Sequence, residues 1–140
     1  MLPKAPAPKA ILEAALYVDD LDAAEEFYGG LLGLERIQRA DNRHVFFRCG
    51  NSVLLLFSAS ETAKAAGNPR LPVPPHGAHG PGHVCLAQPR EDMQEMRDRL
   101  RAAGVDIEAE FDWPHGPRSV YFRDPAGNSV EIAEPHLWSY

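Results

Sequence analysis

The sequence predicts an α+β fold built from two tandem copies of one βαβββ unit. The tetrapeptide "GNSV" occurs twice, at residues 50–53 and again at 127–130. Each copy comes late in the same expected order of strand, helix and three further strands. The apolar stripes of the two expected helices also have the same offsets: Leu21, Ala24, Tyr28 and Leu31 in the first, and Met93, Met96, Leu100 and Ala103 in the second. The chain is therefore predicted to be a tandem duplication.

In the first unit, residues 10–18 ("AILEAALYV") alternate as a strand does, with Glu13 and Tyr17 on one face. Residues 19–33 predict a helix that Asp19 or Asp20 can cap and that Gly33 ends. The paired glycines at 29–30 weaken the middle of this prediction. A short strand is expected at 34–39, followed by strands at 43–48 and 52–57 that are joined through the glycine turn.

The second unit repeats this order. Residues 82–88 predict a strand with His83 and Cys85 on one face, and residues 90–104 predict a helix that ends at Gly104. A short strand is expected near 105–110, and two longer strands at 119–124 and 128–134. In the last strand, Ser129, Glu131 and Ala133 share one face, while Val130 and Ile132 lie on the other.

The domain boundaries follow from these elements. Residues 1–9 form an arm, 10–58 the first unit, 59–81 a Pro/Gly-rich linker, 82–135 the second unit and 136–140 a tail; 10–135 make one domain. The stretch 67–82 holds five prolines and four glycines, too many for regular structure. We expect His76 and His79 there to be surface or lid residues. In the tail, Trp138 is expected to pack against the body.

Composition narrows the classes of function. The formal charge is −6, which argues against nucleic acid or an anionic membrane as the main partner. No apolar run approaches the roughly 20 residues that span a bilayer. The first ten residues have no hydrophobic stretch, unlike a secretory signal. The two cysteines, Cys49 and Cys85, are too few for a disulfide framework and fit a reduced cytoplasm. A cytoplasmic location is therefore expected.

Paired βαβββ units with "YVDDLDAAEEFYGGLLGLE" in the first and "YFRDPAGNSVEI" in the second resemble the vicinal oxygen chelate superfamily. This group includes glyoxalase I, extradiol dioxygenases, fosfomycin-resistance transferases and bleomycin-resistance proteins. The resemblance covers about residues 10–135. It implies that the sheets form a cupped, barrel-like mixed sheet, with a divalent metal held inside by side chains from equivalent strands.

The resemblance also implies a ligand set. Superimposing the halves places Glu13 opposite His83, and Leu54 opposite Glu131, in the four places that family ligands occupy. Glu13, His83 and Glu131 are able to bind a metal, whereas Leu54 is not. Two oxygens and one imidazole suit one divalent Mn, Fe, Ni or Zn ion per site, with open positions for a substrate. Read singly, each of these residues is as compatible with a structural or solvent-facing role.

Tyr121 lies at the place of a substrate-contacting tyrosine in the fosfomycin and extradiol enzymes, where its hydroxyl would orient or protonate a substrate oxygen. An aromatic core residue is the alternative. Tyr121 and Glu131 are the expected catalytic residues. The substrate-binding residues expected beside Tyr121 are Ser119 on its strand and, in the preceding segment "FDWPHGPRS", Trp113, His115 and Arg118.

The favoured function is a metal-dependent lyase, isomerase or transferase that acts on a small oxygen-rich molecule by chelation and electrophilic catalysis. The alternative is a non-enzymatic sequestering protein of the bleomycin-resistance type, and a second is an extradiol-type dioxygenase. Glu13 stands where extradiol enzymes have a histidine, which argues against the dioxygenase reaction. Leu54 stands where glyoxalase I has a glutamate, which argues against the glyoxalase I reaction. A homodimer is expected, with Glu13 of one chain joining His83 and Glu131 of the other.

Overall fold

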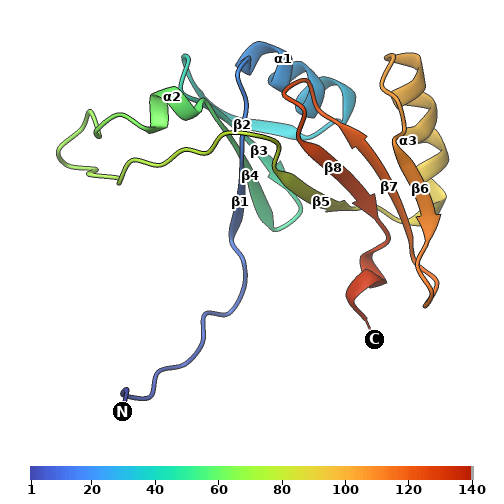
Figure 1. Ribbon diagram of the computed structural model, residues 1–140, viewed down its shortest axis with the longest axis horizontal. Coiled ribbons are helices and arrows are strands. Elements are labelled where there is room, and N and C mark those ends of the chain that lie inside the picture. Colours follow the sequence, from blue (N-terminus) through green and yellow to red (C-terminus); the bar gives the residue numbers. More distant parts are fainter. Residues whose placement is uncertain (140) are drawn as a thin grey trace.

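The computed structural model describes residues 1–139 and contains both repeated units (Figure 1). The first unit comprises β1 (Glu13–Tyr17), α1 (Leu21–Glu25), η1 (Glu26–Leu31), β2 (Glu35–Ala40), β3 (His44–Cys49) and β4 (Ser52–Phe57). The second comprises β5 (His83–Ala87), α3 (Arg90–Ala102), β6 (Ala109–Asp112), β7 (Arg118–Arg123) and β8 (Ser129–Ala133). A short helix α2 (Ala59–Thr62) follows the first unit, and a 3₁₀ turn η2 (Pro135–Trp138) follows the second. The predicted fold class is confirmed.

Each unit forms one mixed four-stranded sheet. The strand orders are β1-β4-β3-β2 and β5-β8-β7-β6, with the first strand of each unit parallel to the last and the other neighbours antiparallel. The sheets are cupped and do not close into a barrel (Figure 1). Because β1 and β5 stand at sheet edges, each leaves one row of backbone groups open to a further strand.

The helix predicted over 19–33 is only partly α-helical. Asp20 caps it by accepting from the Ala23 N–H at 3.0 Å. After Glu25 the chain widens into a π-helix, in which the Leu32 N–H donates to the Phe27 carbonyl at 2.9 Å. Gly29 explains the close packing there, since a Cβ at this position would lie 3.0 Å from the Phe47 ring. The requirement for a glycine in this wide turn therefore comes from a contact with a neighbouring strand.

One hydrophobic core joins the two units. The rings of Phe27 and Phe122 are 6.0 Å apart, and those of Tyr28 and Phe47 are 6.3 Å apart, so η1 packs against both sheets. The buried side chains of Met93 and Leu100 place α3 on the outer side of the second sheet (Figure 1). The opposite face of each sheet is left as the inner face of the cup.

The second copy of the repeated turn ties the units together. The Asn128 side chain accepts from the Gly82 N–H at 2.7 Å and donates to the Tyr17 carbonyl at 3.0 Å and to Asp124 at 2.9 Å. Only 1% of Asn128 is exposed, whereas Asn51, its counterpart in the first copy, is exposed. The same letters thus have different structural roles in the two units.

At the C-terminal end the prediction for Trp138 is wrong. Trp138 is 77% exposed, and Leu137 is the residue of η2 that is buried. The 3₁₀ turn that begins at Pro135 directs Leu137 inward. None of the helices described over residues 1–139 is both long and apolar enough to cross a membrane.

Candidate metal and substrate site

The register of the second sheet brings the predicted residues together on its inner face. Cys85 on β5 is opposite Glu131 on β8, and Glu131 is opposite Tyr121 on β7. Directly paired residues point to the same side of a sheet, whereas Val130 and Ile132, on either side of Glu131, belong to the core. The predicted alternation of the last strand is therefore confirmed.

His83 and Glu131 form the centre of this face. The His83 Nε2 lies 3.4 Å from the Glu131 Oε1. The other ring nitrogen, Nδ1, lies 3.1 Å from the Ser129 carbonyl, which can only accept a hydrogen bond. The proton of a neutral ring therefore sits on Nδ1, and Nε2 presents its lone pair toward Glu131.

The second oxygen of Glu131 is held from behind. Its Oε2 accepts from the Ser119 hydroxyl at 2.5 Å, and the Ser119 Oγ accepts from the Trp113 indole N–H at 2.8 Å. Glu131 is 5% exposed and Ser119 is fully buried. This chain of hydrogen bonds fixes the carboxylate and leaves Oε1 directed at His83.

These two groups fit a metal ion. A divalent ion about 2.0–2.2 Å from a nitrogen and an oxygen, at an angle of about 90–110°, needs the two atoms roughly 2.9–3.5 Å apart. The 3.4 Å separation between His83 and Glu131 lies within that range. A histidine that donates its other N–H to a carbonyl, and a carboxylate oriented by a hydroxyl, are the supports that metal ligands usually have.

Aromatic and sulfur groups surround the pair. The Tyr121 ring is stacked between His83, at 6.3 Å and 20°, and Phe111, at 5.8 Å and 14°. Burial and the nearby Glu131 raise the pKa of the Tyr121 hydroxyl, so it remains a hydrogen-bond donor at neutral pH. The same two causes raise the pKa of Cys85 to about 12, which keeps its thiol protonated. Phe111 and Cys85 were not among the predicted site residues, although the alternation along their strands was the signal that would have found them.

Glu13 is placed elsewhere in the chain. It is exposed on the first sheet, where it lines a separate cavity of about 680 Å³. Over residues 1–139, no three His, Cys, Asp or Glu side chains converge as a metal site. Within one chain, the structure joins His83 to Glu131 but leaves the third predicted ligand apart.

The assignment of Leu54 to the fourth ligand place is wrong by one residue. Leu54 is opposite Ala14 and Phe47, is 2% exposed and belongs to the core. Leu55 is opposite Ala15 on the inner face, as Glu131 is opposite Cys85. Leu55 therefore occupies the place that corresponds to Glu131, and it too is unable to bind a metal.

Two of the expected substrate-binding residues have other partners. Arg118 forms ion pairs with Asp112 at 2.8 Å and Glu110 at 3.3 Å. His115 contacts the Leu137 carbonyl at 2.9 Å through Nε2, which ties it to the C-terminal turn. In contrast, Trp113 and Ser119 reach Glu131 through hydrogen bonds.

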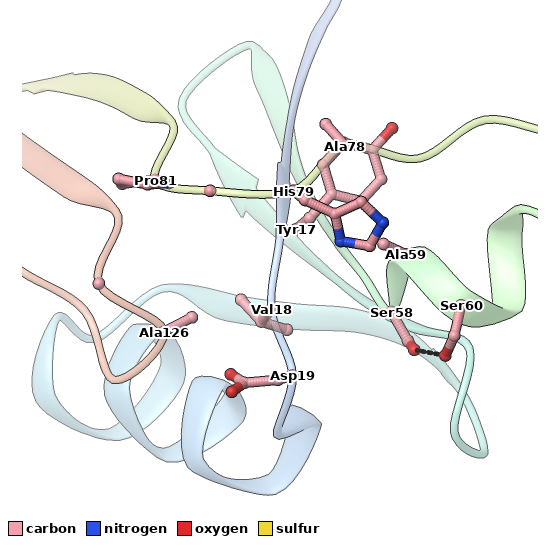
Figure 2. A pocket seen from close by; sticks show the side chains of 12 residues that line it. Tyr17, Val18, Asp19, Ser58, Ala59, Ser60, Ala78, His79, Pro81 and Ala126 are labelled. Carbon is pink, nitrogen blue, oxygen red and sulfur yellow. Dashed lines mark hydrogen bonds between the residues drawn. The ribbon is translucent and has the colours of Figure 1, made fainter.

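A further cavity, of about 520 Å³, lies where the units meet (Figure 2). Tyr17, Val18 and Asp19 line it from the end of β1, and His79 lines it from the linker. None of the predicted metal ligands lines this cavity. His79 is exposed, in agreement with the surface position expected for it.

Fold and site together define a protein of two βαβββ units whose cupped sheets carry a histidine–glutamate pair. A model of the Glyoxalase/Bleomycin resistance protein/Dioxygenase superfamily matches residues 10–132. The chain belongs to this superfamily, which is the vicinal oxygen chelate group predicted from its motifs.

Solved structures agree with this placement, and no curated protein matches the chain. Lactoylglutathione lyase from Agrobacterium tumefaciens is similar at 46% identity and a TM-score of 0.88, over 96% of this chain and 100% of that one. A glyoxalase/bleomycin resistance protein/dioxygenase from Nocardioides shares the fold at 24% identity and a TM-score of 0.70, over 93% of this chain and 85% of that one. A glyoxalase/dioxygenase from Nostoc punctiforme does so at 21% identity and 0.68, over 95% and 97%.

Proposed function

We propose that the protein is a divalent-metal enzyme of the lyase or isomerase type that acts on a small molecule with neighbouring oxygens. The observation that supports this most is the His83–Glu131 pair, oriented on both sides by Ser129 and by Ser119 with Trp113. The similarity to a protein named lactoylglutathione lyase points to the same class. Lactoylglutathione is therefore the first compound to test.

Glu13, His83 and Glu131 would hold the ion, with Mn, Fe, Ni and Zn as the candidates. When bound, the metal would supply Lewis-acid polarisation of substrate oxygens. The chain's own groups have separate tasks. Tyr121 keeps its proton and would donate a hydrogen bond to a substrate oxygen, and Ser119 fixes the Glu131 carboxylate so that its Oε1 stays directed toward His83.

We further propose that the site is shared between two chains of a homodimer. The inner faces of β1 and β5 are open, with Glu13 and His83 exposed. The segment before β1 also exposes Ile11 at 84% and Leu12 at 76%, which is apolar surface that an interface would bury. Placing β1 beside a partner's β5 would complete the cup and bring Glu13 to the other chain's histidine–glutamate pair.

The first experiment measures metal content. Protein purified without chelators and loaded with Mn, Fe, Ni or Zn should hold close to one ion per chain, and His83→Ala and Glu131→Gln should lose it. If elemental analysis finds no bound metal, the enzyme proposal fails. A sequestering protein would then be the better candidate, as the 680 Å³ cavity with its aromatic lining and the leucine at the fourth ligand place already favour.

The second experiment tests the shared site. Glu13→Ala and His83→Ala proteins are unfolded together, refolded and assayed for bound metal. Random pairing makes about half of the dimers mixed, each with one intact site, so roughly a quarter of the sites should recover. A mixture of His83→Ala with Glu131→Gln is the matched control, because both losses fall in the same half-site and nothing should recover. Absence of recovery in the first mixture, with subunit exchange verified, would contradict the shared site.

A further inference from the structure

The cavity over the inner face of the first sheet is covered by a roof segment, residues 62–76. His76 fixes this segment in two ways: its Nδ1 lies 2.6 Å from the Tyr17 hydroxyl, and its backbone N–H donates to the Thr62 carbonyl at 2.9 Å. The open cavity beneath this segment has a volume of about 680 Å³, which is large enough for a small molecule.

Flat rings line much of this space. His44 and Phe46 are stacked, with centroids 4.0 Å apart and planes at 9°. The Phe57 ring meets Phe46 edge-on at 5.5 Å and His76 edge-on at 4.7 Å. Surfaces of this kind favour a flat apolar or aromatic group, since ring faces and edges attract one another in such arrangements.

Arg43 supplies a fixed positive charge at the same cavity. Its Nη1 donates to the His44 Nδ1 at 2.6 Å, and its guanidinium carbon lies 5.5 Å from the centre of the Phe57 ring. Over residues 1–139, no carboxylate forms an ion pair with Arg43, whereas Lys64, the other cation lining the cavity, is bound to Glu61 at 2.5 Å. Arg43 therefore has donors available for a ligand.

His44 holds Arg43 without adding charge. A guanidinium only donates, so the His44 Nδ1 must accept, and its Nε2–H donates to the Gln38 Oε1 at 2.8 Å. Burial and the adjacent guanidinium lower the pKa of His44, which agrees with a neutral ring. The histidine is thus a positioning residue for Arg43.

We propose that this cavity binds a carboxylate attached to a flat apolar group, with Arg43 as the carboxylate-binding residue. The further claim that this ligand is part of the enzyme's substrate rests on the proposed function, in which Glu13, a residue that lines the same cavity, binds the metal. Glu13 precedes Tyr17 by four residues on β1, and Tyr17 is opposite Phe57, which is opposite His44. Four strand residues span about 13 Å, so the carboxylate end would lie at the far side from the metal ligand.

The experiment uses metal-free protein and the probe 3-phenylpropanoate, with 3-phenylpropanamide as its uncharged counterpart. Binding is followed by chemical shifts of the protein amides. The acid should perturb residues around Arg43 and bind at least about tenfold more tightly than the amide, since a charged hydrogen-bonded pair contributes about 1.4 kcal/mol or more. Arg43→Gln should remove this preference and Arg43→Lys should retain part of it. Arg101→Gln, on the exposed face of α3, controls for net charge and should have no effect.

Equal binding of acid and amide to the unaltered protein would overturn the proposal, and so would full acid preference in a folded Arg43→Gln protein. His83→Ala separates the two hypotheses, because it should abolish metal uptake and leave the acid preference unchanged. In the unaltered protein, absence of metal binding with the acid preference intact would contradict only the proposed enzyme. Loss of the acid preference with metal binding intact contradicts only the role of Arg43.

Discussion

The two copies of the GNSV turn allow a matched test of how the units are joined. Asn128→Ala removes the hydrogen bonds to the Gly82 N–H, the Tyr17 carbonyl and Asp124, all from a side chain that is 1% exposed. Two bonds to backbone groups and one to a carboxylate contribute about 2–4 kcal/mol together when partners are left buried. Asn51→Ala alters the same letter in an exposed turn and should change the free energy of unfolding by less than about 0.5 kcal/mol.

The measurement is urea unfolding followed by circular dichroism. With a slope of about 2 kcal/mol per molar urea, Asn128→Ala should lower the midpoint by about 1–2 M, and Asn51→Ala should leave it within about 0.3 M. Each protein is measured at several concentrations, because the stability of a dimer depends on concentration. If Asn128→Ala loses less than about 1 kcal/mol, or if the two variants lose the same amount, the second copy is not the connection between the units.

Three further predictions concern the site and the core. Trp113→Phe removes the indole N–H at the end of the chain to Glu131, so metal affinity measured by calorimetry should fall about 10–100-fold; unchanged affinity would mean that this chain does not orient the carboxylate. Gly29→Ala places a Cβ 3.0 Å from a buried ring and should cost about 1–3 kcal/mol in thermal unfolding, whereas Gly30→Ala, whose Cβ would lie 3.8 Å from the Glu26 Cγ, should not destabilise; equal effects would contradict the packing explanation. Fe(II)-loaded protein should not consume dioxygen with catechols in an oxygen electrode, and sustained uptake that Tyr121→Phe abolishes would favour the dioxygenase alternative.

The elements that the sequence predicted well are those with a local cause. Helix α3 runs Arg90–Ala102 within the predicted 90–104, and β4 is Ser52–Phe57, within the bounds expected. Alternation of apolar residues and glycine stops act over a few residues, so they can be read from the letters alone. The π-helix η1 differs because the contact that requires Gly29 comes from Phe47, far along the chain.

The site was predictable to the extent that alternation within each strand decides which residues share a face. Two-residue alternation assigned His83 and Glu131 to one face of their strands, the family resemblance implied that this face is the inner one, and the structure brings the two side chains to 3.4 Å. The support from Trp113 required the chain to turn back from β6 into β7, which alternation does not describe. The place of Glu13 relative to that pair depends on how sheets from different units, or different chains, meet.

Aligning the two sheets on the repeated tetrapeptide gave a wrong result, because strand register is set by the length of the turn and not by the identity of its residues. β3 and β4 pair up to Cys49 and Ser52, which leaves residues 50–51 as the turn. β7 and β8 pair up to Arg123 and Ser129, so the second turn spans residues 124–128 and contains the buried Asn128. A shift of one residue moves every side chain of a strand to the other face.

That shift explains why one copy of the turn is followed by a leucine and the other by a carboxylate. After the two-residue turn, the third residue of β4 is Leu54, which enters the core, where a carboxylate would be unpaired and costly. After the longer turn, the corresponding third residue of β8 is Glu131, which reaches the inner face beside His83 and the Ser119 hydroxyl. Burial excludes an unpaired charge from the position of Leu54, whereas the position of Glu131 supplies hydrogen-bond donors for a carboxylate. The difference between the copies therefore follows from the face of the sheet that each turn presents.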